Sequence, residues 1–173
     1  MNFNLLASTT RSGGKWASAE LLKILNELGD IEAVAHETSV LGLVVADTKL
    51  DPFEAVHKMR GLLKEVPWTF RSVLKVIPIE KVVGTEVETI SSAVSELAHK
   101  IDANETFRVT VDKRYSAVHT NAIVEAVASR IVNEVSLENP DKIILIEVLG
   151  GITGISILKL EDILSVVKEK KLI

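Results

Sequence analysis

The sequence predicts an α+β protein in which short strands are covered by amphipathic helices. Hydrophobic residues make up 47% of the 173 positions and aromatic residues only 4%, so the apolar content is mostly aliphatic. Along the chain, apolar residues recur with strand spacing in some segments and helix spacing in others. The formal net charge of −4 excludes a protein coated in basic surface, so nucleic-acid binding would need a local patch. The absence of cysteine excludes disulfides and thiolate chemistry.

Residues 1–79 are predicted to form one module with βαββαβ order. Gly29 follows the apolar stripe of the first helix and ends it. Asp51 is the expected N-cap of the second helix, Pro52 its first residue, and Pro67 stops it. This order is that of the ferredoxin-like arrangement. The expected strands cover 3–7, 31–37, 40–46 and 71–79, and the expected helices cover 16–28 and 52–66.

Residues 80–160 are predicted to form a second, α/β domain, and 161–173 a C-terminal helix and tail. The domain begins after a connector at 78–85. Its second helix is expected to start near His119, with Thr120 as N-cap. The continuous apolar run at 143–146 suits a strand covered on both faces. The expected strands are 107–112, 143–146 and 154–158, and the expected helices are 86–99, the one beginning near 119, and 160–170.

The segment from Phe107 to Tyr115 combines a strand pattern with a basic, aromatic end. Phe107, Val109 and Val111 share one face, and Lys113, Arg114 and Tyr115 follow where the strand is expected to end. Two cations and a ring at a strand end suit contact with a phosphate backbone and a stacked base. The alternative is a solvated strand end.

A second group of cations lies between Lys58 and Lys81, a segment with six cations and only two acidic residues. Arg71 and Lys75 are four residues apart on an expected strand and therefore share a face. The neighbouring rings of Trp68 and Phe70 are expected in core or interdomain packing, with base stacking as the alternative. This segment predicts a local basic patch.

No residue pattern predicts catalysis, a metal or a cofactor. The loop at 12–15 fails the P-loop pattern because position 9 is Thr and Trp16 follows Lys15. It is either a plain connection or a loop whose Arg11 or Lys15 contacts an RNA phosphate. His119 is either a polar helix start or a phosphate contact. Glu147, within an apolar strand, is expected to pair with a cation rather than act as a catalytic acid.

Several segments in the second half resemble a THUMP domain. They are Phe107–Tyr115, the helix start at His119-Thr120, the turn at 137–141, the run at 146–150 and Gly154-Ile155-Ser156. The first half is similar to the ferredoxin-like module that usually accompanies THUMP. The resemblance implies RNA binding, because THUMP domains accompany tRNA-modifying enzymes and capture the acceptor stem and 3′ end of tRNA.

Since these 173 residues show no signature of a methyltransferase, a P-loop pyrophosphatase or a deaminase, the chain resembles stand-alone THUMP proteins that act as adaptors for tRNA acetylation. The resemblance implies a non-enzymatic adaptor without a cofactor, whose partners are tRNA and a separate modifying enzyme, here an N4-acetylcytidine-forming acetyltransferase. The N-terminus has no signal-peptide pattern and no segment approaches 18 uninterrupted apolar residues, so a cytoplasmic protein without membrane contact is expected. A small enzyme acting on a phosphorylated substrate and a protein–protein scaffold are the alternatives. The expected RNA-binding residues are Arg108, Lys113, Arg114, Tyr115, His119, Arg71, Lys75, Arg11 and Lys15.

Overall fold

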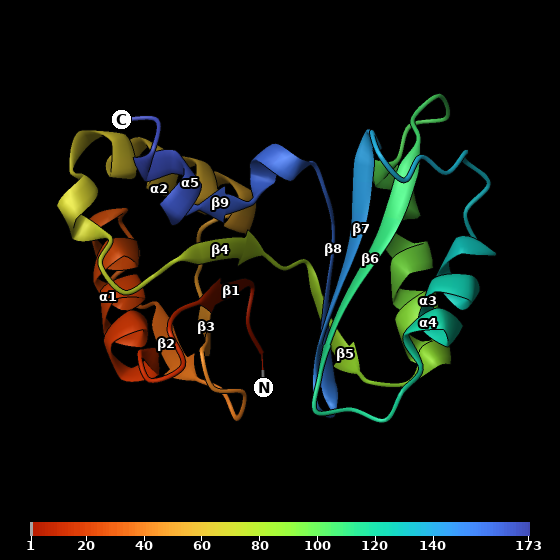
Figure 1. Ribbon diagram of the computed structural model, residues 1–173, viewed down its shortest axis with the longest axis horizontal. Coiled ribbons are helices and arrows are strands. Elements are labelled where there is room, and N and C mark those ends of the chain that lie inside the picture. The colour runs from red at the N-terminus through yellow and green to blue at the C-terminus, as the bar shows by residue number, and fades with distance from the viewer. Residues whose placement is uncertain (1) are drawn as a thin grey trace. The chain divides into compact units, whose positions relative to one another are not determined.

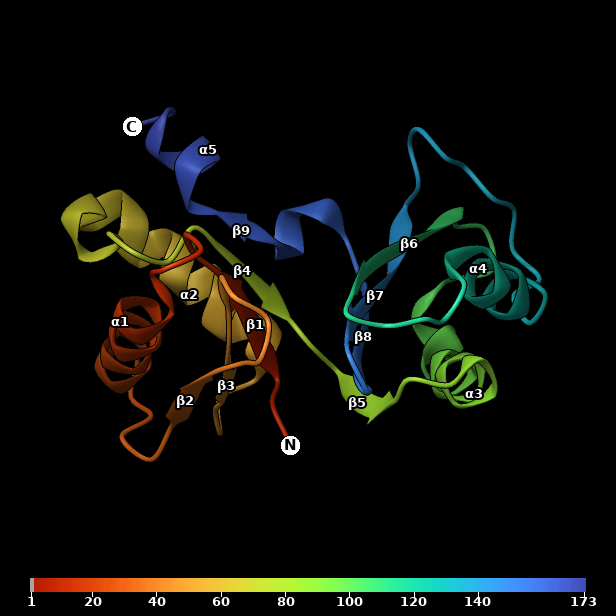
Figure 2. The same cartoon turned by 60° about the horizontal axis from the view of Figure 1, so that its bottom comes forward.

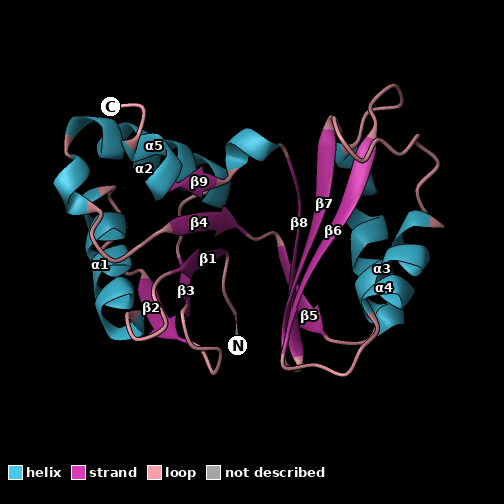
Figure 3. Cartoon of the chain, in the orientation of Figure 1, coloured by secondary structure: helices cyan, strands magenta, loops and turns pink. Residues whose placement is uncertain are grey.

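A computed structural model describes residues 2–173, which divide into two compact units (Figure 1, Figure 2). Unit 1 contains the chain up to Ile79 together with Glu161–Ile173, and unit 2 is Glu80–Leu160. Each unit has its own mixed set of helices and strands (Figure 3). Each also has its own cluster of buried apolar side chains.

Unit 1 is an antiparallel sheet with strand order β2-β3-β1-β4-β9. As far as β4, its elements follow the predicted βαββαβ order. The strands are shorter than expected from the sequence because several apolar residues at their ends lie in turns. The elements are β1 (Leu5–Ser8), α1 (Gly14–Glu27), β2 (Val34–Glu37), β3 (Leu43–Asp47), α2 (Pro52–Glu65), β4 (Lys75–Pro78), β9 (Leu164–Ser165) and α5 (Val166–Lys170).

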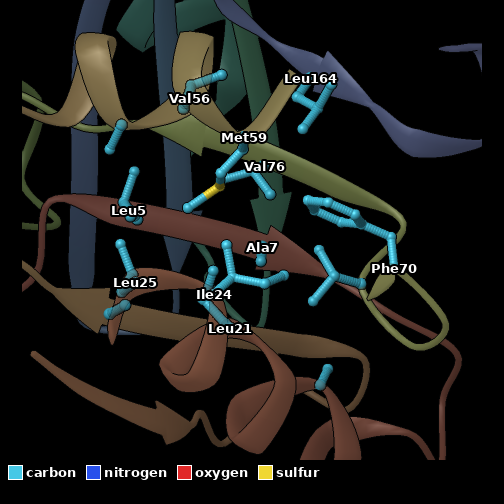
Figure 4. Close-up of a cluster of buried hydrophobic side chains, with 14 of the residues drawn as sticks. Leu5, Ala7, Leu21, Ile24, Leu25, Val56, Met59, Phe70, Val76 and Leu164 are labelled. Carbon is cyan, nitrogen blue, oxygen red and sulfur yellow. The ribbon is translucent and has the colours of Figure 1, made fainter. Parts of the chain in front are cut away.

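The core of unit 1 forms where α1 and α2 cover one face of this sheet (Figure 4). Leu21, Ile24 and Leu25 of α1 are fully buried, because their spacing of three and four residues places them on one side of the helix. Asp51 caps α2 as predicted: its carboxylate accepts the backbone N–H groups of Phe53 and Glu54 at 2.9 and 3.1 Å.

The expected helix at 160–170 is wrong over its first six residues, because α5 begins only at Val166. The C-terminal residues also belong to unit 1 and are not a separate tail. After a 3-10 turn at Leu160–Asp162, the short strand β9 pairs with β4 and only then does α5 begin. Leu164 and Val166 are buried in the core of unit 1. The sequence pattern missed β9 because a two-residue strand has no periodicity; its pairing with β4 defines it.

Unit 2 is a four-stranded sheet with order β5-β8-β7-β6, in which β6 and β7 are parallel and the other neighbours are antiparallel. The expected connector at 78–85 is wrong at residues 81–84, which form the strand β5 and pair with β8. This strand forms because it pairs at the edge of the sheet with a segment distant in the chain. The elements are β5 (Lys81–Gly84), α3 (Val87–Leu97), β6 (Phe107–Arg114), α4 (Thr120–Ala128), β7 (Lys142–Leu149) and β8 (Ile152–Leu158).

Helices α3 and α4 pack on the same face of this sheet (Figure 1). Phe107, Ile144 and Ile146 are buried there with Ile90 of α3 and Ile123 of α4. The alternation expected for β6 thus points its apolar residues at the helices. His119, rather than Thr120, occupies the N-cap of α4, and its side chain forms no capping hydrogen bond.

Candidate nucleic-acid interface

The strand β6 was expected to end at residue 112, but it continues through Lys113 and Arg114. Parallel pairing with β7 reaches as far as Arg114 opposite Leu149, which holds these residues in extended backbone. Neighbouring residues of a strand point to opposite faces. Lys113 therefore lies on the face of Phe107, and Arg114 on the other. The two cations do not form one tip.

Arg114 forms an ion pair with Glu147 on β7. Its Nη1 lies 2.5 Å from Oε2 of Glu147, whose residue surface is only 1% exposed. This pair confirms the structural interpretation of Glu147. Burial raises the pKa of Glu147 to about 7; the nearby Arg114 opposes the rise, and Asp112, its neighbour across the ladder, adds to it. The guanidinium thus compensates a buried carboxylate.

Lys113, Tyr115 and His119 are the exposed members of the predicted set at this end of unit 2. The ammonium group of Lys113 donates a hydrogen bond to the carbonyl of Val118 at 2.9 Å, which links the strand end to the loop before α4. Tyr115 is 70% exposed and has φ 54°, in the left-handed region. A cation, a phenol ring and an imidazole therefore border one short loop, residues 115–119.

Arg108 is not brought to this group. It lies six residues before Arg114 on the same strand, a separation of about 20 Å at the usual rise of a strand. Its Nη1 donates to the carbonyl of Leu137 at 2.9 Å, and its Nε donates to the hydroxyl of Thr110 at 3.3 Å. Arg108 therefore holds the turn at residues 137–141, near the opposite end of β6.

In unit 1 the predicted cations come from two separate segments. Arg71 precedes β4, so the argument that it shares a strand face with Lys75 is wrong. Its Nε donates to the carbonyl of Trp68 at 3.2 Å. Lys75 pairs with Ser8 at the end of β1, from which the loop that carries Arg11 and leads to Lys15 at the start of α1 departs. The sheet register therefore places Lys75 at the start of that loop.

The glycines of this loop have a packing role. A Cβ on Gly13 would lie 2.5 Å from the hydroxyl of Thr9 and 2.6 Å from that of Thr10. A Cβ on Gly14 would lie 2.5 Å from a carboxylate oxygen of Glu37. The start of α1 therefore packs against the protein's own carboxylate, which disfavours an additional phosphate at that point. This arrangement supports the interpretation of the loop as a plain connection.

The two rings beside Arg71 have different positions. Phe70 is 1% exposed and belongs to the core, as expected. Trp68 is 63% exposed, so the expectation that it packs in the core is wrong. Trp16 is 70% exposed and was not considered from the sequence as a binding residue. The available signal was its position outside the stripe of Leu21 and Leu25 on α1.

Residues 84–158 match the family model of the THUMP domain. This segment is a THUMP domain. The match covers α3, β6, α4, β7 and β8, and so includes Lys113, Tyr115 and His119. A THUMP domain is an RNA-binding domain that occurs in the context of tRNA modification. The comparison with curated proteins found no match for the chain.

Solved structures share the fold of the THUMP-containing chain. PH1313 from Pyrococcus horikoshii Ot3 is 20% identical with a TM-score of 0.67 over 91% of this chain and 54% of that one. TrmN from Thermus thermophilus is 16% identical, with a TM-score of 0.57 over 88% and 44%. A 4-thiouridine synthetase in complex with RNA and ATP is 13% identical, with a TM-score of 0.53 over 95% and 42%. The chain spans about half the length of these proteins.

Within residues 2–173, no three His, Cys, Asp or Glu side chains are grouped as metal ligands would be. No helix in that range is both long enough and apolar enough to cross a membrane.

Proposed function

We propose that this chain is a cytoplasmic, non-catalytic adaptor that binds tRNA at its acceptor stem and 3′ end. It then presents the tRNA to a modifying enzyme on a separate polypeptide. The match of residues 84–158 to the THUMP family carries this proposal. The fold shared with a 4-thiouridine synthetase solved in complex with RNA supports the same ligand class. An N4-acetylcytidine-forming acetyltransferase is our candidate for the partner, from the resemblance of the sequence to stand-alone THUMP proteins.

The exposed residues at the end of β6 make the direct contacts with RNA. Lys113 neutralises a backbone phosphate, Tyr115 stacks on a terminal base, and His119 donates to a neighbouring phosphate. Arg114 maintains the strand end through its pair with Glu147. In unit 1, Arg71 and Lys75, both exposed, extend the phosphate contacts.

The proposal includes a ferredoxin-like assignment for unit 1. Its support is the βαββαβ element order together with the strand order β2-β3-β1-β4 and antiparallel pairing throughout. The strand β9 is an addition at the β4 edge.

A gel-shift titration with two forms of one tRNA tests the 3′-end contact. Intact tRNA is expected to bind about 5- to 150-fold more tightly than the same tRNA lacking its 3′-terminal nucleotides, because the lost stacking on Tyr115 is of order 1–3 kcal/mol per base. Equal binding of the two forms would contradict the 3′-end assignment. Acetylation of tRNA by this chain alone, supplied with acetyl-CoA, would contradict the adaptor role.

The variant Lys113→Ala is expected to weaken tRNA binding and to lower the slope of log affinity against log salt by about one. The physical reason is that one phosphate contact fewer releases one counterion fewer. The matched control is Lys49→Ala, which removes a lysine whose side chain is 70% exposed and lies outside the proposed contacts. Affinity measured over a series of salt concentrations gives the slope. An unchanged slope in Lys113→Ala, or the same loss in both variants, would remove Lys113 from the interface.

A further inference from the structure

Both tryptophans of the chain lie exposed in unit 1, on segments that one carboxylate joins. Trp16 and Glu20 are four residues apart on α1 and therefore lie on one side of the helix, one turn apart. The carboxylate of Glu20 accepts the backbone N–H groups of three consecutive residues, Arg71 at 2.9 Å, Ser72 at 3.1 Å and Val73 at 2.7 Å. This fixes the segment after Trp68 against the helix that carries Trp16.

The position of Trp68 follows from the same segment. It lies in the 3-10 turn Pro67–Thr69, and its carbonyl accepts a hydrogen bond from Nε of Arg71. The side chain is 63% exposed although the next aromatic residue, Phe70, is buried. Thus the turn directs one ring into the core and leaves an indole in solvent within three residues of a guanidinium.

Cations outnumber acidic side chains around the two indoles. Lys23 follows Trp16 by seven residues and Glu20 by three, on the same side of α1. Lys170 of α5 reaches the carbonyl of Phe70 with its ammonium group at 2.5 Å. Arg71 is the third cation, and all three are exposed. Two carboxylates on the same side of α1 oppose these cations: Glu20, which accepts the three backbone N–H groups, and Glu27, four residues after Lys23.

We propose that Trp16 and Trp68 form a stacking site for unpaired nucleotides of bound RNA, whose phosphates contact Lys23, Arg71 and Lys170. This assignment rests on the proposed tRNA binding and adds the part of the ligand that unit 1 takes. Indoles stack on any base because every base has a π face, while cations beside them follow the backbone. The three cations favour a polyanion over an apolar peptide as the occupant.

The composition of the chain provides a direct reporter, because Trp16 and Trp68 are its only two tryptophans. Titration of the full chain with short single-stranded oligouridylate is expected to quench its tryptophan fluorescence in a saturable way. The single-tryptophan variants Trp16→Phe and Trp68→Phe then show which indole responds. In gel shifts, Trp16→Ala and Trp68→Ala are each expected to weaken binding about 5- to 150-fold, the affinity equivalent of one stacked base.

The control is Ile31→Ala, which truncates another side chain of unit 1 that is 84% exposed but lies outside the site. It is expected to leave both readouts unchanged. RNA binding without quenching, and with unchanged affinity in both alanine variants, would overturn the stacking site while leaving the proposed tRNA binding in place. Failure of the unaltered chain to bind any RNA would overturn both. Alanine variants that keep RNA affinity but lose a co-purifying protein would assign the indoles to a protein partner and overturn the proposal.

Discussion

Replacing Arg114 by Met is expected to lower the free energy of unfolding by about 3–5 kcal/mol at about pH 8. The substitution keeps a long apolar stem but leaves the carboxylate of Glu147, 1% exposed, without its cation. An uncompensated buried charge must either remain unsolvated or take up a proton, and both cost free energy. Urea unfolding followed by circular dichroism measures the change.

Two matched variants separate this mechanism from a general effect of losing an arginine. Arg108→Met removes a guanidinium from the same strand, but one that contacts a carbonyl and a hydroxyl rather than a buried carboxylate. It is expected to cost less than about 1.5 kcal/mol. The double variant Arg114→Met/Glu147→Leu removes both charges and is expected to recover most of the stability. A double variant as unstable as Arg114→Met would show that the buried charge is not the cause.

The variant Glu147→Gln is expected to gain stability relative to the unaltered chain as the pH rises from about 4 to about 8. In the folded protein the pKa of Glu147 is about 7, against an ordinary value of 4.5. Below both values the group is protonated in both states. Between them the unfolded chain ionises first, so the stability of the unaltered protein falls as pH rises, and above about pH 7 the loss is complete. The difference between these two pKa values corresponds to about 3 kcal/mol.

This comparison isolates one group, because every other titrating side chain is present in both proteins. The quantity to measure is the difference between the two free energies of unfolding across the pH range. A difference that does not change with pH would mean that Glu147 ionises in the folded protein at its ordinary pKa. A difference that grows as the pH falls would reverse the sign and contradict the role of burial.

The features of the fold that the sequence predicted correctly depend on contacts between residues close together in the chain. The capping of α2 by Asp51 was correct because its donors are two and three residues away, within reach of any sequence window. The strands β5 and β9 were missed because each exists through a partner distant in the chain, β8 and β4 respectively. Their residues carry too little periodicity to reveal this.

The candidate site shows the same division. Tyr115 and Lys113 were expected near a strand end and are exposed there. The pairing of Arg114 could not be derived from its neighbours, because the carboxylate that holds it lies 33 residues later. The exposure of Trp68 beside the buried Phe70 likewise depends on how the 3-10 turn meets the core. Sequence gives the type of side chain, and the three-dimensional neighbours determine whether it is available to a ligand.

The backbone of Tyr115 has an evolutionary consequence. A non-glycine residue in the left-handed region costs about 1–2 kcal/mol, a cost that glycine avoids. Selection for stability alone would therefore favour glycine at this position, whereas selection for an aromatic surface would maintain the ring. The residue at this position in related proteins would record which of the two pressures has been stronger.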